Sequence, residues 1–113
     1  MNLSVELLEK ESVHHFYITG EIDAFTAPLL KEKLTAVQDT PGLHAELNLS
    51  GVTYIDSTGL GVFVGFYKTL KANEGSMKIT GVNERVNRLF EITGLDEIIH
   101  IEKGVGENRD ATL

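Results

Sequence analysis

The sequence predicts a single α/β domain with a mixed β-sheet of four to five strands and helices packed on it. Residues 3–9 and 13–19 have the pattern of two strands joined by a short turn at 10–12, which indicates a hairpin. The rest of the chain alternates between helical and strand-like spacing of apolar residues, in the order helix, strand, helix, strand, helix. Such an order requires parallel strands joined by right-handed helical crossovers. The 113 residues can build one such core but not two.

Local signals mark the ends of the elements in the first half of the chain. We expect the second strand to close at Gly20. In TAPLLKEKLTAVQD the apolar residues recur at helical spacing, Thr26 can cap the helix, and Pro28 is tolerated in its first turn. The pair Pro41-Gly42 is expected to end this helix. Residues 43–49 then alternate strictly between apolar and polar side chains, which is typical of a strand with one buried face.

The second half contains two further helices and a strand between them. One helix is expected from Gly59 to near Asn73, a strand at 77–81, and a last helix between the cap Asn83 and the stop Gly94. The first of these helices has an apolar stripe formed by Leu60, Phe63, Val64, Tyr67 and Leu70. Its Gly59 and Gly61 are expected to allow a tight turn and close packing of the helix.

The end of the chain is expected to be less regular. Residues 98–101 form a last short strand or a turn, and the folded domain is placed at 1–103. The polar stretch 104–113 is expected to be a disordered tail. Arg85 and Arg88, three residues apart on the last helix, form either a solvated face or ion pairs with a partner.

Composition excludes several classes of function. There are no cysteines, so disulfides and thiolate metal sites are impossible, and the histidines at 14, 15, 44 and 100 lack the spacing of a zinc site. A net charge of −7 disfavours nucleic acid and anionic membranes as partners. The amino-terminal segment lacks the pattern of a signal peptide, and no stretch approaches the roughly 20 apolar residues of a membrane span. We therefore expect a cytoplasmic protein without metal or cofactor.

The chemistry-bearing segment is IDSTGL at 55–60, which follows a predicted strand. Ser57 lacks the setting of a hydrolase nucleophile, because Ile55 stands where the first glycine of that motif is required and no base is placed nearby. STGLG lacks the lysine of a phosphate-binding loop. The simplest role is a helix cap supplied by Asp56, Ser57 or Thr58.

Two features go beyond a cap. A cap needs one oxygen, whereas this turn supplies three in succession. The helix that follows also carries Val62 and Phe66, four residues apart, beside its main stripe. These two residues indicate either a protein-binding flank or a wider core contact, and periodicity alone leaves both open.

Three segments carry a resemblance to a known family. YIDSTGLGVFVGFYK resembles the central signature of the anti-sigma factor antagonists, the STAS domain family, and GEIDAFTAP resembles their first junction of strand and helix. MKITGVNERVNRLFEITGL is similar to their last strand and helix. The resemblance covers residues 3–101. Within the family the chain looks most like the anti-sigma-B factor antagonists of Gram-positive bacteria.

The resemblance implies a binding module that is not an enzyme and has no small-molecule substrate. Family members bind an anti-sigma factor that is also a serine kinase, and so release a sigma factor for stress transcription. The kinase phosphorylates the serine after the motif aspartate, which is Ser57 here, with Thr58 as a secondary acceptor. The phosphorylated antagonist dissociates from its partner, and a serine phosphatase restores the unphosphorylated antagonist. The expected partner-binding residues are Asp23, Asp56, Ser57, Thr58, Gly59, Val62 and Phe66.

The physics of a phosphate at this position is consistent with such a switch. A phosphate adds roughly −1.5 to −2 charges, which the amino-terminal end of a helix tolerates. The fold should therefore survive, and the disruption should fall on the interface.

Asp23 either starts a solvated turn or, as the resemblance implies, helps to present the serine or contacts the partner. Two alternatives stay open, a STAS scaffold module without phosphorylation and a hydrolase using Ser57.

Overall fold

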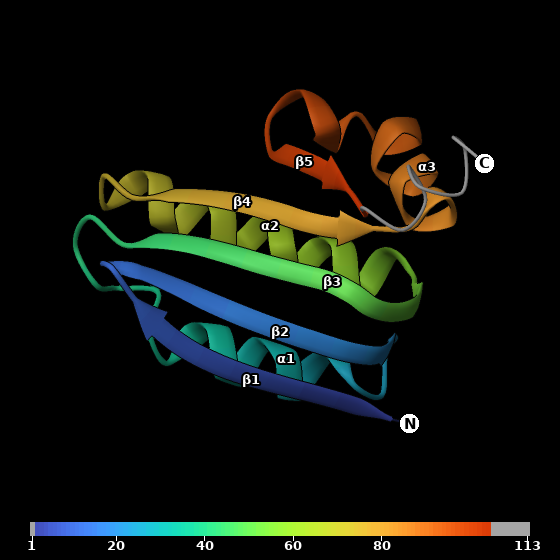
Figure 1. The fold of residues 1–113 in the computed structure, drawn as a ribbon, viewed down its shortest axis with the longest axis horizontal. Helices are drawn as coiled ribbons and strands as arrows, with labels where there is room; N and C mark the ends of the chain where they lie inside the picture. The colour runs from blue at the N-terminus through green and yellow to red at the C-terminus, as the bar shows by residue number, and fades with distance from the viewer. Residues whose placement is uncertain (1, 105–113) are drawn as a thin grey trace.

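Five strands form one mixed sheet in the order β1-β2-β3-β4-β5, which confirms the predicted fold class (Figure 1). The computed structural model describes residues 2–104. β1 runs antiparallel to β2, whereas the three other pairs of neighbouring strands are parallel. The elements in chain order are β1 (Leu3–Lys10), β2 (Val13–Ile22), α1 (Ala27–Thr35), β3 (His44–Ile55), α2 (Ser57–Ala72), β4 (Ser76–Val82), α3 (Glu84–Thr93), the 3₁₀ turn η1 (Leu95–Glu97) and β5 (His100–Lys103).

The predicted hairpin is present and its turn has a clear cause. Glu11 and Ser12 both have positive φ, 55° and 70°, which is the backbone of the two-residue turns that match the twist of antiparallel strands. The prediction that β2 closes at Gly20 is wrong. The strand continues to Ile22 through a register shift at Gly20, whose φ is 113°. A glycine is required there because a Cβ would meet the carbonyl oxygen of Asn2.

The core lies between the sheet and the helices that connect its strands. Ala45, Leu47 and Leu49 of β3 are buried in alternation with polar residues, as their spacing predicts. β3 is longer than the predicted 43–49 and reaches Ile55, because its second half pairs with the end of β2. Figure 1 shows α1 and α2 behind the sheet and α3 near its β4–β5 edge.

Helix ends follow local signals in some places and not in others. Asn83 caps α3 by accepting from the Val86 amide at 2.8 Å, and Gly94 ends it with a φ of 77°, as predicted. α1 ends at Thr35, so the prediction that it reaches Pro41-Gly42 is wrong. Thr26 also makes no side-chain cap for α1, because its hydroxyl is used elsewhere.

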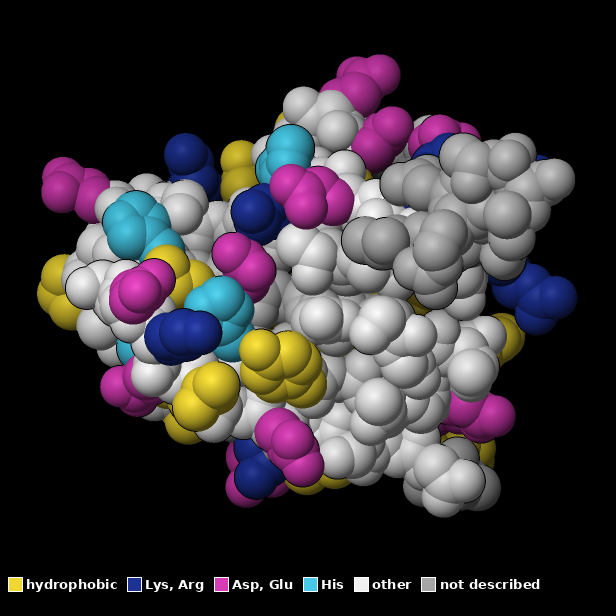
Figure 2. Space-filling model, in the orientation of Figure 1, with side chains coloured by type: hydrophobic (Ala, Val, Ile, Leu, Met, Phe, Trp, Pro, Cys, Tyr) yellow, Lys and Arg dark blue, Asp and Glu magenta, His cyan; other side chains and the backbone are white. Residues whose placement is uncertain are grey.

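The face of the sheet opposite α1 and α2 carries a row of histidine, acidic and basic side chains. His15, Glu46 and Lys78 are neighbours on adjacent strands, with Nδ1–Oε1 and Nζ–Oε2 distances of 3.5 Å and 3.6 Å. Lys78 also approaches Glu102, which accepts from His100. Figure 2 shows this band of histidine, basic and acidic side chains across the sheet. All five are at least partly exposed, so the row stabilises the fold only weakly.

Within residues 2–104, no helix is both long and apolar enough to cross a membrane. The same part of the chain contains no group of histidine and carboxylate side chains that could hold a metal ion. The predicted tail at 104–113 lies, apart from Gly104, outside the described residues.

Candidate functional site

Two turns lie side by side at the carboxyl ends of β2 and β3. Glu21 is paired with Tyr54 and Ile22 with Ile55 in the parallel register. One step further, the Asp56 amide donates to the Ile22 carbonyl oxygen at 3.2 Å. The pairing therefore brings the segment containing Asp23 next to the start of α2, as expected for this edge of a parallel sheet.

Asp56 is the residue that caps α2. Its Oδ1 accepts from the amides of Thr58 at 3.0 Å and Gly59 at 3.4 Å, and its backbone is extended. Two amides that lack a partner within the helix are thereby satisfied. Of the three candidate oxygens in this turn, the carboxylate does the capping, so α2 does not need the hydroxyls of Ser57 and Thr58 for this purpose.

Ser57 is the first residue of α2 and is exposed, as is Thr58. Among residues 2–104, no hydrogen bond involves the hydroxyl of Ser57. His14 and His15 lie at the opposite end of β2, roughly 25 Å away along the strand. His44 and His100 likewise begin their strands. Ser57 therefore has no imidazole within reach to act as a base, which argues against the hydrolase alternative.

Asp23 organises the turn between β2 and α1. Its Oδ1 accepts from the amides of Phe25 at 2.9 Å and Thr26 at 3.0 Å. The Thr26 hydroxyl accepts from the Asp23 amide at 2.9 Å and donates to the Glu21 carbonyl oxygen at 2.7 Å. The hydrogen bond from the Thr26 amide, followed by that from Phe25, lowers the pKa of Asp23. Asp23 thus helps to build the turn that lies beside Ser57.

Gly59 allows α2 to pack closely on the ends of both strands. A Cβ on Gly59 would collide with Cγ2 of Ile22 and lie 2.9 Å from Cγ1 of Ile55. Gly59 is buried, so its contribution to the site is this close approach rather than exposed surface. Gly61 differs, because a Cβ there would meet nothing within 4 Å. The prediction of close packing is therefore confirmed at Gly59 and wrong at Gly61.

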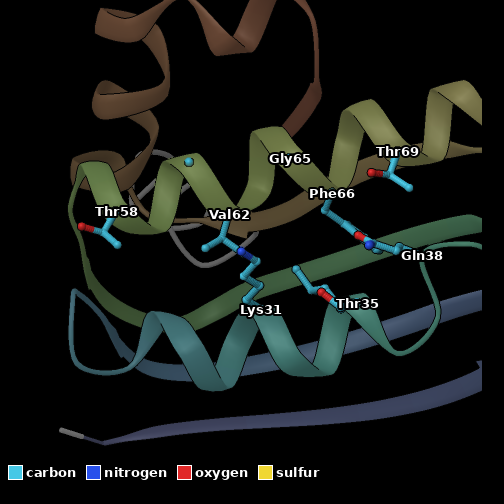
Figure 3. Close-up of a pocket in the computed structure, with 10 residues that line it drawn as sticks. Lys31, Thr35, Gln38, Thr58, Val62, Gly65, Phe66 and Thr69 are labelled. Atoms are coloured by element: carbon cyan, nitrogen blue, oxygen red, sulfur yellow. The ribbon is translucent and has the colours of Figure 1, made fainter.

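Val62 and Phe66 do not share a free flank. Phe66 is 2% exposed and contacts Phe16 edge to face at 6.0 Å between ring centroids, so it belongs to the core. Val62 is partly buried at a groove of about 380 Å³ between α1 and α2, which also contains Thr58. Figure 3 shows Lys31 of α1 extended toward Val62. Of the two residues, only Val62 is accessible at the surface.

The sequence interpretation missed Phe25, which lies in the Asp23 turn. Its side chain is 81% exposed, the largest value among the exposed large apolar residues of the described chain. The hydrogen bond from its amide to Asp23 fixes the backbone that presents it. The available signal was a large aromatic residue inside a polar turn, which is typical of binding surfaces.

Comparisons with known proteins agree with the resemblance seen in the sequence. A family model described as STAS domain matches residues 4–108. The anti-sigma-B factor antagonist of Listeria monocytogenes is 45% identical over 108 residues, which cover 95% of each chain. That of Staphylococcus aureus is 41% identical, covering 92% of this chain and 96% of its own.

Among solved structures, an anti-sigma factor antagonist from Mycobacterium paratuberculosis superimposes with a TM-score of 0.82 at 25% identity. The match covers 97% of this chain and 93% of the mycobacterial one. The similarity therefore extends over the whole sheet and its helices as well as the segment around Ser57.

Proposed function

The chain belongs to the STAS domain family and is an anti-sigma factor antagonist, a non-enzymatic regulator, and we propose that Ser57 is the residue that controls it. Without phosphate, the chain binds an anti-sigma factor and so frees a sigma factor for stress transcription. A serine kinase, which is the anti-sigma factor itself, phosphorylates Ser57 and ends this binding. A serine phosphatase restores the active form. Because the proposed partners act on transcription, we propose that the protein acts in the cytoplasm.

The observation that carries the proposal is the division of roles at the start of α2. Asp56 caps the helix, while the Ser57 hydroxyl is exposed and makes no hydrogen bond within residues 2–104. A kinase can therefore reach Ser57 without unfolding the turn. The added phosphate would lie at a helix amino terminus, where the helix dipole favours negative charge.

The loss of binding follows from the charges around Ser57. Asp56 is adjacent in sequence, and the hydrogen bond between Asp56 and Ile22 brings the Asp23 turn alongside. A phosphate adds about −1.5 to −2 charges to this acidic surface. A 100-fold loss of affinity corresponds to about 2.7 kcal/mol, which is within the cost of one buried, unpaired charge.

We propose that the partner surface consists of Asp23, Phe25, Ser57, Thr58 and Val62. Phe25 replaces Phe66 as its aromatic contact, because Phe66 is buried in the core. Asp56 and Gly59 support this surface through the cap and the close packing of α2. Thr58 is exposed and remains a secondary acceptor for phosphate.

The decisive experiment combines phosphorylation with binding. The chain is incubated with the anti-sigma factor and ATP, the modified residue is mapped by mass spectrometry, and the complex is followed by calorimetry. Wild-type protein should acquire phosphate on Ser57 and dissociate, whereas Ser57→Ala should stay bound after ATP is added. If Ser57→Ala still dissociates, with Thr58→Ala behaving as wild type, Ser57 is not the control residue. If ATP neither modifies wild-type protein nor releases it from its partner, the scaffold alternative gains support.

A further inference from the structure

A second groove lies at the end of the molecule where β3 meets α3. It encloses about 310 Å³ between the last residues of β3 and one face of α3. Ile55 and Val86 are buried at its base, and Leu89 is partly buried. Figure 1 shows α3 and the turn from β3 to α2 at the same end of the sheet. The groove is called the β3–α3 groove below.

Two large apolar side chains at this groove are exposed. Ile92 of α3 is 73% exposed and Tyr54 of β3 is 45% exposed. Both line the groove together with Leu89, so the apolar surface is continuous rather than scattered. Tyr54 is also close in sequence to the Asp56 cap, which links this groove to the Ser57 turn. A clustered apolar surface of this kind indicates a protein contact.

Two cations frame the same groove. Arg85 and Arg88 line it and are exposed, and neither makes an ion pair within residues 2–104. They share one face of α3 with Leu89 and Ile92, because positions 85, 88, 89 and 92 follow the helical repeat. This concentration of positive charge contrasts with the net charge of −7 for the whole chain.

We infer that the β3–α3 groove binds an amphipathic, acidic segment of the anti-sigma factor, as a second contact region beside the Ser57 surface. The inference rests on the proposed function for the identity of the partner. Apolar side chains of the segment fill the space between Tyr54 and Ile92, and its carboxylates pair with Arg85 and Arg88. Tyrosine and arginine around an apolar centre are the residues that most often dominate binding energy.

Charge complementarity favours an acidic partner segment, because the groove combines two exposed arginines with an apolar stripe. A second copy of the chain is the competing occupant, which the sedimentation test below identifies. Guanidinium groups also bind carboxylates in a bidentate manner, which gives orientation as well as attraction. Because the arginines are exposed, their pairing should weaken as salt is raised.

The test measures affinity for the anti-sigma factor by calorimetry at low and high salt. The variants are Arg85→Glu/Arg88→Glu and Ile92→Ser, with Lys68→Glu/Lys71→Glu as the matched control. The control reverses two exposed charges on α2, away from the groove, and so gives the same net charge. We expect both groove variants to bind about tenfold or more weakly at low salt, and the arginine variant to lose much of the salt dependence.

Several outcomes would overturn the inference. The inference is wrong if the groove variants bind the anti-sigma factor within about twofold of the control. It is also wrong if sedimentation shows a concentration-dependent dimer that Ile92→Ser abolishes. Ser57→Asp, measured in the same series, separates the two proposals. If it binds tightly while the groove variants do not, control through Ser57 fails and the groove stands. If Ser57→Asp binds weakly while the groove variants match the control, the groove inference fails and control through Ser57 stands. If wild-type protein does not bind the anti-sigma factor, both proposals fail.

Discussion

The amide of Asp56 donates to the carbonyl oxygen of Ile22 at 3.2 Å, and this single hydrogen bond joins the two turns on which the proposed partner surface lies. It continues the parallel pairing of β2 and β3 by one residue beyond the last paired position, Ile22 with Ile55. The Ser57 turn and the Asp23 turn are therefore held next to each other. Changes beneath these turns should affect stability and binding together, whereas changes on their surface should affect binding alone.

Gly59→Ala should destabilise the protein, and Gly61→Ala should not. At Gly59 the added methyl group would collide with Ile22, and overpacking of this kind costs about 1–3 kcal/mol. At Gly61 the methyl group meets nothing within 4 Å, so alanine should stabilise the helix by up to about 1 kcal/mol. Urea unfolding of both variants measures the difference. Equal effects at the two positions would contradict the packing described for Gly59.

Ser57→Asp should fold as well as the wild type but bind the anti-sigma factor weakly. The carboxylate lies at the amino-terminal end of α2, where negative charge is favourable, so the free energy of unfolding should change by less than about 0.5 kcal/mol. Thermal unfolding and calorimetry measure the two effects. Ser57→Asn is the neutral control of similar size. A melting temperature far below that of the control would mean that the helix terminus does not accept the charge.

Phe66→Ala and Phe25→Ala should separate stability from binding. Phe66 is buried against Phe16, and its truncation should cost about 3–5 kcal/mol of unfolding free energy. Phe25 is 81% exposed, so its truncation should leave stability within about 0.5 kcal/mol and weaken partner binding. Denaturant unfolding and calorimetry on the same samples test both. Unchanged affinity in Phe25→Ala would remove Phe25 from the proposed surface.

Asp23→Asn should make the free energy of unfolding less dependent on pH in the acid range. The folded-state pKa of Asp23 is lowered, first by the Thr26 amide, so the carboxylate stabilises the folded state above its ordinary pKa of about 3.9. That stabilisation is lost as pH falls through the lowered pKa. Unfolding measured from pH 6 to pH 2 should show a smaller decline in the variant. Parallel curves for variant and wild type would refute this role of the carboxylate.

Local signals predicted several features correctly because the responsible forces act within a few residues. Asn83 and Gly94 mark the ends of α3 through one side-chain hydrogen bond and one left-handed backbone conformation. The alternation at residues 43–49 predicted the buried face of β3, since successive side chains of a strand point to opposite faces. The order of elements likewise follows from periodicity.

Other features depended on which elements become neighbours. Phe66 is a core residue because β2 places Phe16 against it. The helical spacing of apolar residues in α2 cannot predict that contact. β2 extends past Gly20 because β3 continues to pair with it. Thr26 bonds to the Glu21 carbonyl oxygen rather than capping α1, since the turn folds back onto the end of β2.

By itself, the sequence determined the α/β order, the family, and an aspartate followed by two hydroxyl residues at the start of a helix. Only the tertiary structure decided that Asp56 provides the cap, that the Ser57 hydroxyl remains exposed, and that the Asp23 turn with Phe25 lies alongside. The physical reason is that a cap is a local hydrogen bond, whereas a binding surface is assembled by parallel pairing of strands that are far apart in the chain.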